Sequence, residues 1–453
     1  MRVLAVAEVL LRLVGADDPG VMSMQGMMLH AVHGGDGSAW LADTPLLDRL
    51  LDALGSSSAG SQDGGGGGVG GGSSRGDATQ HANAAEVLVG IARCAPSALA
   101  AKLAGKDSMR KLFLRGLGGA LSRYGEGVPG GGGSVNAPGL EPGGGCAVTA
   151  HDGASSSPLV NVLDIAIAVI DAKRAAGSTQ SMQAFLQMEC SEPPTARAAP
   201  LEALEGCLEF LPALVAFLEV EGDGAMMHAT WGTMAPPLGL KRVKVVDLLA
   251  TLLSSHHDTV AAAVLECGAL PVCCRLFAQY PFNNFLHHHV ESMMTSVLEW
   301  GHPQLVAHLL TRTEHGGCDV IGVVTGAAQT VATVRGPMRA GNLGHVTRLG
   351  NKLVSLAAGN FDAAQAGCDE AAAAATAAAL AAALAADARW GAHVEGNLKE
   401  RNAVENVYKW SCGRPAGLDD KGGGVESDND EDMMTRDFDI GLGGGFSRDV
   451  YHR

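Results

Sequence analysis

The sequence predicts an all-α protein, an armadillo/HEAT-like helical-repeat solenoid with disordered Gly-rich insertions. Apolar residues recur at helical spacing in several separate stretches, whereas the apolar/polar alternation of a half-buried strand hardly occurs. Each stretch is of modest length and has a single apolar stripe, so it must pack on neighbouring helices, as in a bundle or a solenoid. No strict sequence period is visible, and the repeats are therefore expected to be degenerate.

Composition supports helices and narrows the class of partner. The 453 residues are 47% hydrophobic but only 4% aromatic, and cores of Ala, Leu and Val suit closely packed helices. A formal net charge of −16 argues against general binding to nucleic acid, whose phosphates need a basic surface, and against anionic membranes. We expect a protein partner, with no nucleic acid and no membrane.

Cysteine usage and the first residues predict the compartment. Ten cysteines are scattered along the chain, which indicates buried, reduced thiols rather than a disulfide scaffold. Glu8 and Arg12 interrupt the apolar first residues and no clear small-residue cleavage site follows, so no signal peptide is expected. We expect a cytoplasmic protein, with the nucleus as a second location.

Five stretches carry the helical pattern most clearly. In chain order they lie at residues 84–91, 159–170, 201–218, 245–252 and 290–298. Pro212 is expected to kink or divide the third of them. The Ala-rich segment 371–386 has high helix propensity but almost no apolar stripe, so a helix and a low-complexity loop are both open.

The helical stretches are expected to form one domain, residues 1–412. Its insertions at residues 55–76 and 124–158 are rich in Gly, Ser and Pro and cannot offset the entropy of ordering, so both should be flexible. Residues 413–453 are expected to be a disordered acidic tail. There Ser427 precedes several acidic residues, which resembles an acidophilic kinase site and makes it a candidate phosphosite; a merely solubilising tail is the alternative.

The sequence predicts no catalytic site, no cofactor and no metal site, and hence no enzyme. A G-x-S-x-G string occurs at residues 72–76, but it lies in a Gly/Ser insertion without the strand–turn–helix context of a nucleophile elbow. Residues 287–289 are three consecutive histidines. Successive helical residues point about 100° apart, so these three cannot easily share one ion.

Residues 281–291, P-F-N-N-F-L-H-H-H-V-E, are the most informative stretch of the chain. They indicate a turn that presents polar groups at the start of a helix and contain no catalytic arrangement, which favours recognition over chemistry. The candidate partner-binding residues here are Asn283, Asn284, Phe285 and His287. The alternative is structural: the amides cap and lock the helix, and a histidine packs or hydrogen-bonds inside.

Two further segments carry candidates of the same kind. Trp231 precedes a pair of prolines that fix a turn, so it is either a packed connector residue or an anchor for a partner. In residues 341–351, His345 and Arg348 fall on one helix face at i, i+3 and complete the set of partner-binding candidates. A buried polar clamp between helices is the alternative for this pair.

Together these segments resemble the SAPS family, the regulatory subunits of the protein phosphatase 6 type of serine/threonine phosphatase. The family pattern T-T-W-G-x-x-x-P-P-x-G is similar to residues 229–239, W-N-N-F-L-H to residues 282–287, and G-x-x-G-H-L-T-R-I-A-N to residues 341–351. The three occur in family order with compatible gaps. Phe282 stands where the family often has Trp, and the chain begins at a point that corresponds to the interior of the family domain.

The resemblance implies a helical-repeat fold and a non-catalytic regulatory or scaffold subunit. Such a subunit binds a serine/threonine phosphatase catalytic subunit of the protein phosphatase 6 type and directs it to substrates or further adaptor proteins. The resemblance carries over no individual contact residue. A general armadillo-like interaction adaptor, unrelated to phosphatases, is the alternative.

Overall fold

The structure is a computed structural model, and it describes residues 6–11, 39–54, 73–93, 97–121, 158–171, 199–220, 226–229, 232–234, 236–333, 336–360 and 370–405. The chain divides into two compact units, Met1–Asn402 and Ala403–Arg453. Helices begin at Ser73 and Pro158, inside the two predicted insertions, whose other residues lie outside the described part. The predicted tail, residues 413–453, also lies outside it, so the domain boundary at residue 412 stays a prediction.

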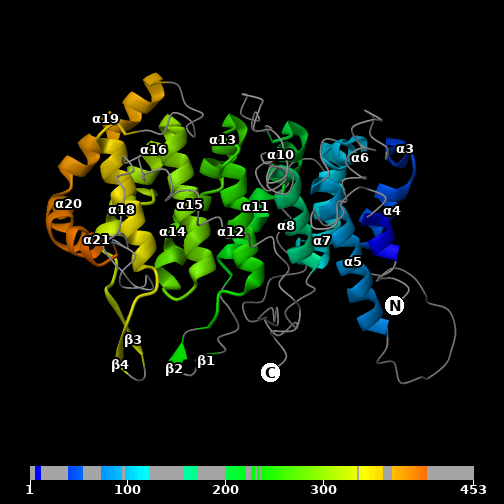
Figure 1. Ribbon diagram of the computed structural model, residues 1–453, viewed down its shortest axis with the longest axis horizontal. Coiled ribbons are helices and arrows are strands. Elements are labelled where there is room, and N and C mark those ends of the chain that lie inside the picture. Colours follow the sequence, from blue (N-terminus) through cyan, green and yellow to red (C-terminus); the bar gives the residue numbers. More distant parts are fainter. Residues whose placement is uncertain are drawn as a thin grey trace, which may run out of the picture. The chain divides into compact units, whose positions relative to one another are not determined.

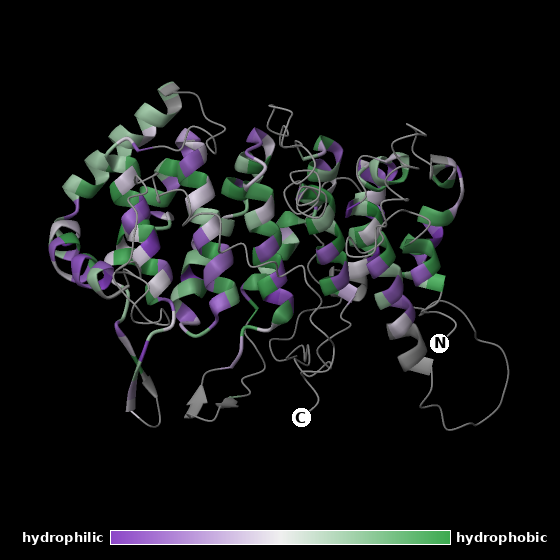
Figure 2. Ribbon diagram, viewed as in Figure 1, coloured by the Kyte–Doolittle hydropathy of each residue, from purple (hydrophilic) through white to green (hydrophobic). Residues whose placement is uncertain are grey.

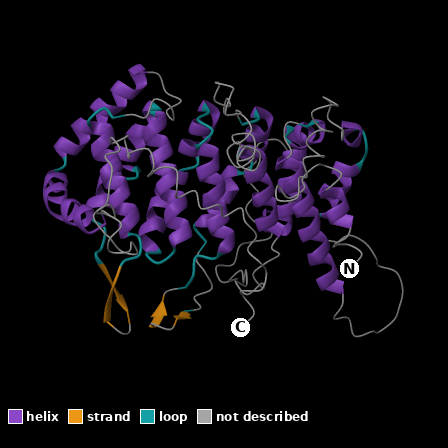
Figure 3. Cartoon of the chain, in the orientation of Figure 1, coloured by secondary structure: helices purple, strands orange, loops and turns teal. Residues whose placement is uncertain are grey.

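Helices dominate the unit Met1–Asn402 and lie in three rows, which confirms the predicted all-α helical-repeat class (Figures 1 and 3). Within the first row each helix contacts the next one of that row. The first row contains α4 (Leu46–Ala53), α7 (Lys106–Leu121), α10 (Leu201–Leu208), α13 (Asp258–Glu266), α16 (Pro303–Leu310) and α19 (Glu370–Ala386).

The second row contains α3 (Ala39–Ala42), α6 (Ala98–Leu103), α11 (Leu211–Leu218), α14 (Ala269–Gln279), α17 (Val320–Thr325) and α20 (Ala388–His393). The third row contains α5 (Ser73–Arg93), α8 (Pro158–Ile170), α12 (Leu240–Leu253), α15 (Asn284–Trp300) and α18 (Leu343–Ala357), followed by the π-helix η2 (Val394–Leu398) and α21 (Lys399–Glu405). Neighbours within the third row contact one another from α5 to η2, as do those of the second row from α3 to α6 and from α11 to α20. A 3₁₀ turn, η1 (Thr313–His315), precedes α17.

From α10 onward the chain visits the first, second and third rows in turn, so three consecutive helices form one repeat. The clearest repeats are α10–α11–α12, α13–α14–α15 and α16–α17–α18, which follow one another from right to left in Figure 1. Each repeat buries its apolar stripes against its neighbours, as expected of a solenoid. Their lengths differ because the connections differ, which explains why no strict period is visible in the sequence.

Pro212 divides the predicted helix at residues 201–218, as expected. α10 ends at Leu208 and α11 begins at Leu211, with Pro212 in its first turn. Proline is tolerated there because the first amides of a helix have no partner within the helix. The break lets the two short helices occupy different rows.

The Ala-rich segment is helical rather than a loop. Three residues interrupt the alanines of α19 after Glu370, namely Thr376, Leu380 and Leu384, and they recur at i, i+4 and i+8. All three are buried, and α19 packs on α16 and α18. The packing stripe is therefore present in the sequence, although it is only three residues long.

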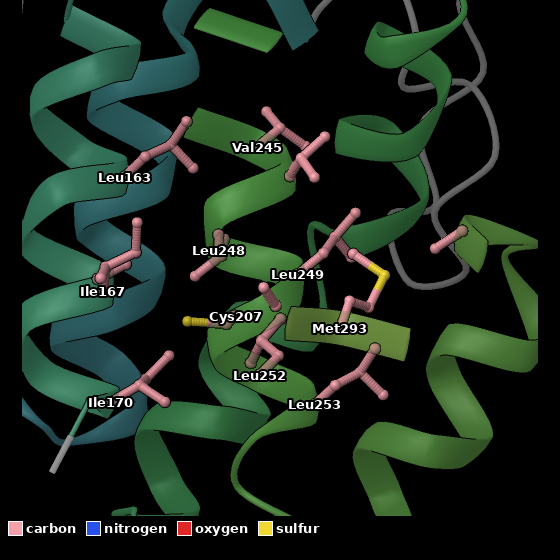
Figure 4. Packing of buried hydrophobic residues seen from close by; sticks show 14 of the residues in the cluster. Leu163, Ile167, Ile170, Cys207, Val245, Leu248, Leu249, Leu252, Leu253 and Met293 are labelled. Carbon is pink, nitrogen blue, oxygen red and sulfur yellow. The ribbon is translucent and has the colours of Figure 1, made fainter. Parts of the chain in front are cut away.

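The core is continuous through the repeats. Figure 4 shows Leu163 and Ile167 of α8 facing Leu248 of α12, with Cys207 of α10 below Leu248 and Met293 of α15 on the other side. Hydrophobic residues gather where neighbouring helices meet (Figure 2). Each fully buried Leu, Ile or Val stabilises the fold by about 1.5–3 kcal/mol relative to exposure.

Two antiparallel hairpins interrupt the helices, and the sequence did not predict them. β1 (Met227–Ala229) pairs with β2 (Gly232–Met234), and β3 (Thr330–Thr333) pairs with β4 (Gly336–Arg339). The hairpins contact each other through β2 and β3 and lie at the same edge of the helices (Figure 1). Strands of three or four residues are too short to show a period of two in the sequence.

Candidate partner-binding surface

The three sequence segments singled out above lie at equivalent places in three consecutive repeats. Each lies in, or begins in, the connection between a second-row helix and a third-row helix. Residues 219–239 join α11 to α12, residues 280–283 join α14 to α15, and residues 326–342 join α17 to α18. The hairpins are parts of the first and last of these connections, so the three segments meet at one edge of the solenoid (Figure 1).

Backbone and side-chain hydrogen bonds tie two of these connections together. The amide of Gly341 donates to the carbonyl of Pro281 at 3.0 Å, and Asn342 Nδ2 donates to the carbonyl of Phe277 at 3.5 Å. The turn before α18 therefore rests on the end of α14 and the turn before α15. Two segments that are distant in the sequence thereby have fixed relative positions.

Arg242 holds the remaining connection. Its guanidinium is largely buried and donates to the carbonyls of Leu238 at 2.7 Å and Val220 at 2.8 Å. It also lies 6.0 Å from the centroid of the Tyr280 ring, in the turn of the next repeat. A buried cation shared by two carbonyls and an aromatic face stabilises the start of α12 against α14.

Asn283 and Asn284 have different tasks. Asn283 is the N-cap of α15, and its Oδ1 accepts the amide of Leu286 at 3.1 Å. Asn284 instead reaches across to α18, where its Oδ1 lies 2.9 Å from His345 Nε2. The structure thus places the first amide in the capping role that the sequence left open and the second in a bridge between repeats.

Glu291 gathers the polar side chains between α15 and α18. His345 Nδ1 lies 2.5 Å from Glu291 Oε2 and carries a hydrogen there, because an ionised carboxylate can only accept. Arg348 donates from Nε to Oε1 and from Nη2 to Oε2, both at 2.6 Å. This bidentate pair uses the geometry in which arginine and carboxylate bind most strongly.

The charges in this network support one another. Burial by itself raises the pKa of Glu291, but hydrogen bonds from His345 and Arg348 outweigh it and hold that pKa below its ordinary value. The hydrogen bond to Glu291 in turn raises the pKa of Arg348, against the opposing effect of its partial burial. The predicted alternative for this pair was a buried polar clamp between helices. The structure shows the clamp through Glu291, with His345 buried but Arg348 exposed.

His287 is completely buried, at 0% exposure. Its Nε2 donates to the Tyr280 carbonyl at 2.8 Å, and its ring packs edge-on against Phe277 and His345. Burial, reinforced by the nearby His345 and opposed by the bond to Tyr280, lowers the pKa of His287 to about 4. His287 is therefore neutral at pH 7 and offers no surface to a partner in this structure, which favours the packing alternative.

The three consecutive histidines point to three different environments. His287 is buried, His288 is exposed, and His289 Nδ1 lies 3.3 Å from Asp247 of α12. Among the described residues no group of three or more His, Cys, Asp or Glu side chains is arranged to hold a metal ion. The separation follows from helical geometry.

A second polar network joins α8, α12 and α15, and the sequence reading missed it. Lys244 Nζ lies 2.7 Å from Asp164 and 3.3 Å from Asp247, which also contacts His289. Burial lowers the pKa of Lys244, but the two carboxylates outweigh it and the net shift is upward. The spacing of Lys244 and Asp247, three residues apart on one helix, was the available signal.

Five side chains are exposed in the first two turns of α12, α15 and α18. They are Leu240, Asn284, Phe285, His288 and Arg348, and we call them the turn face. Phe285 is 56% exposed and Leu240 47%, although both are large and apolar. Among the candidates that the structure describes, Phe285, Asn284 and Arg348 are thus the exposed ones.

Two candidates cannot be placed. Trp231 lies between β1 and β2, outside the described residues, and Ser427 lies in the C-terminal segment, also outside them. Their proposed roles stay predictions.

In the described part of the chain no single helix is long and apolar enough to cross a membrane. The bent pair α13 and α14 is long and apolar enough only when its two helices are taken together.

Comparison with known proteins gives one family. The family model SAPS, described as SIT4 phosphatase-associated protein, matches residues 1–266 and 257–407. Relatives include serine/threonine-protein phosphatase 6 regulatory subunit 1 of Mus musculus, 32% identical over 194 residues, which are 40% of this chain and 21% of that protein. The same subunit of Homo sapiens is 33% identical over 141 residues, covering 28% of this chain and 15% of that protein.

A second kind of relative matches a longer stretch at lower identity. Serine/threonine-protein phosphatase 6 regulatory subunit 3 of Gallus gallus is 25% identical over 226 residues, which are 45% of this chain and 24% of that protein. The chain therefore spans about a quarter or less of the length of these relatives. No solved structure matches it.

Proposed function

The chain belongs to the SAPS family of SIT4 phosphatase-associated proteins, and on that premise we propose that it is a non-catalytic regulatory and scaffold subunit of a phosphatase. Its partner is a serine/threonine phosphatase catalytic subunit of the protein phosphatase 6 type, which it directs to substrates or further adaptor proteins. The observation that carries the proposal is the family match, which extends over residues 1–266 and 257–407.

The relatives support the choice of phosphatase. The relatives described above, from mouse, human and chicken, are named as regulatory subunits of serine/threonine-protein phosphatase 6. The chain spans only part of their length, so binding to the same phosphatase is a proposal for this chain. The helical-repeat fold supports it too, since a stack of repeats displays its connections side by side on one broad surface.

The engagement of the histidines supports a non-catalytic role. Histidine is the commonest general base, and a catalytic one must come within hydrogen-bond reach of the substrate proton that it takes, whereas His287 and His345 are buried. Here His287 is bonded to a backbone carbonyl, His345 to Glu291, and His256 to Ser296 at 3.0 Å. These rings hold helices together.

A compartment forms part of the proposal. The described cysteines Cys207, Cys267, Cys273, Cys274 and Cys318 are free. Free buried thiols suit a reducing environment. We therefore place the protein in the cytoplasm, with the nucleus as a second location.

Direct binding tests the function. The purified chain is mixed with a purified protein phosphatase 6-type catalytic subunit, and with a phosphatase catalytic subunit of an unrelated type as control, and complexes are separated by size-exclusion chromatography. We expect a stable complex with the first and none with the second. Capture from cell extract followed by mass spectrometry then identifies further adaptors.

Two outcomes would contradict the proposal. Failure of the purified pair to form a complex would remove the phosphatase partner and leave the general armadillo-like adaptor as the better description. Hydrolysis of phosphate or carboxylate esters by the purified chain alone would contradict the non-catalytic role.

A further inference from the structure

We propose that the turn face, formed by Leu240, Asn284, Phe285, His288 and Arg348, is the centre of the surface that binds the phosphatase catalytic subunit. The inference rests on the proposed function and adds to it a location and a complementary chemistry. The partner presents an apolar recess to Phe285 and Leu240 and a carboxylate to Arg348.

The first step is the exposure of two large apolar side chains at the same end of neighbouring helices. Leu240 is in the first turn of α12, and Phe285 is in the first turn of α15. The two helices are neighbours in the third row, and the contact between Asp247 and His289 joins them within the first turns of each. Phe285 and Leu240 expose about half of their surface, and aromatic side chains of this kind are enriched at the centres of interfaces.

The second step is rigidity. Asn283 caps the helix that carries Phe285, and Asn284 anchors the same turn to His345 of the next repeat. The turn before α15 also accepts the hydrogen bond from Gly341. A side chain on such a fixed backbone loses little conformational entropy on binding, so the exposed ring is preorganised for a partner.

The third step is charge. The chain has a net charge of −16, yet the acidic residues in the first two turns of α12, α15 and α18, Asp247 and Glu291, are both largely buried and paired. The exposed charged side chain there is Arg348. Its hydrogen bonds to Glu291 use Nε and Nη2 and do not involve Nη1. A partner with a carboxylate at this point complements the surface.

The fourth step is size. A specific interface covers about 800 Å² on each partner, which is more than five side chains provide. The two hairpins lie at the same edge and contact each other, so they extend the surface beside the turn face (Figure 1). Energetically important residues cluster at the centre of an interface and are surrounded by a rim that excludes water. The turn face fits the centre and the hairpins fit the rim.

Charged substitutions on the full chain test the inference. We compare the affinity of the unaltered chain for a purified protein phosphatase 6-type catalytic subunit with that of Phe285→Glu and Leu240→Glu, using isothermal titration calorimetry. Leu114→Glu is the matched control, because Leu114 is 54% exposed on α7 in the first row. We expect Phe285→Glu and Leu240→Glu to weaken binding by at least ~10-fold and Leu114→Glu to leave it unchanged.

The salt dependence of the association rate is a second measurement, and a loss of fold stability would not by itself change it. Arg348→Gln is expected to reduce the dependence of the association rate on salt concentration, because it removes an exposed charge that attracts an oppositely charged partner. Thermal unfolding of each variant confirms that it is folded at the temperature of the assay. Hydrogen exchange of the complex is expected to show protection at the start of α12 and α15.

The outcomes separate this inference from the proposed function. If the unaltered chain binds and Phe285→Glu and Leu240→Glu bind equally well, the turn face is not the docking surface and the proposed function stands. Weakening by either of them, with Leu114→Glu unaffected, supports the turn face. Equal weakening by Leu114→Glu would reveal a general effect of added negative charge and overturn it. If the unaltered chain does not bind, the proposed function fails and this inference with it.

Discussion

The backbone amide of Gly341 lies 3.0 Å from the carbonyl oxygen of Pro281 and donates a hydrogen bond to it. The two residues belong to different repeats and to two of the three segments that mark the sequence as a SAPS family member. A Cβ built on Gly341 would approach the same carbonyl oxygen to 2.8 Å. Glycine is required here by the closeness of the two turns.

Gly341→Ala is therefore expected to destabilise the fold. The added methyl group must displace the turn before α15, and overpacking of this kind costs about 1–3 kcal/mol of unfolding free energy. Urea denaturation followed by circular dichroism measures it. The control is Gly344→Ala in the first turn of α18, where no atom lies within 4 Å of an added Cβ and alanine is expected to stabilise by about 0.5–1 kcal/mol. Equal stability of the two variants would contradict the prediction.

Asn283→Ala is expected to weaken the start of α15. It removes the side-chain acceptor of the Leu286 amide, and loss of an N-cap costs about 1 kcal/mol. Asn283→Asp keeps an acceptor at the same place and serves as the control that should retain stability. Thermal unfolding measures both variants. An Asn283→Ala variant as stable as the unaltered chain would show that the cap is dispensable.

Glu291 and Arg348 are expected to be coupled more strongly than an exposed ion pair. Arg348 is largely exposed, which limits the coupling to about 1 kcal/mol, at the upper end of the range for surface pairs, while Glu291 is largely buried. A double-mutant cycle with Glu291→Gln and Arg348→Gln measures it. The control cycle uses Asp52 and Arg115, which are 2.6 Å apart and both exposed. A coupling no larger than in the control would contradict the prediction.

Acid is expected to destabilise the protein partly through His287. Its pKa is about 4 in the folded chain and has an ordinary value of 6.5, so the unfolded chain binds a proton that the folded chain does not. The free energy of unfolding therefore falls as the pH decreases from 6.5 to 4, by at most about 1.4 kcal/mol per pH unit.

The variant His287→Gln tests this contribution. Its amide nitrogen can replace the donor to Tyr280 but cannot titrate, so the loss of stability between pH 6.5 and 4 is expected to be smaller than in the unaltered chain. Burial also lowers the pKa values of His81, His308 and His393, so part of the slope remains. Unfolding free energies of both proteins are measured in urea across this pH range. If they fall equally steeply with decreasing pH, His287 does not contribute to the loss of stability. His288→Gln, at an exposed position, is the control for replacement of a neighbouring histidine.

Buried thiols are expected to resist alkylation. Burial raises the pKa values of Cys207 and Cys273, and both side chains are inaccessible, so neither thiolate nor reagent contact is available. Iodoacetamide at pH 7.5 followed by mass spectrometry should label these two residues only after denaturation. The partly exposed Cys267 provides an internal comparison and should react faster. Rapid labelling of Cys273 in the folded chain would contradict the buried position.

Much of the helical architecture can be predicted from the sequence, because local periodicity and caps are written in neighbouring residues. The stripes at residues 245–252 and 290–298 correspond to α12 and α15, and Pro212 divides α10 from α11. The hairpins were not predicted, since two short strands are stabilised by their pairing and by contacts between distant connections. The network of Lys244, Asp164 and His289 was missed for the same reason: its members come from three different helices.

The candidate residues divide in a way that neighbouring sequence cannot show. Asn283 and Asn284 are adjacent and chemically identical, yet the first caps its own helix and the second reaches another repeat. Phe285 is exposed and His287 is buried, because residues two positions apart on a helix point about 200° away from each other. The pattern indicated a polar helix start but could not indicate which face of it met the core.

The sequence by itself determined the class of the fold, the positions of its main helices and the family to which the chain belongs. These depend on local spacing, on capping residues and on ordered short motifs, all of which are readable along one dimension. Only the tertiary structure decided that the three motifs meet at one edge, that Glu291 joins His345 to Arg348, and that Phe285 reaches the surface. Those facts depend on which helices become neighbours, and that choice is made by packing across the whole core.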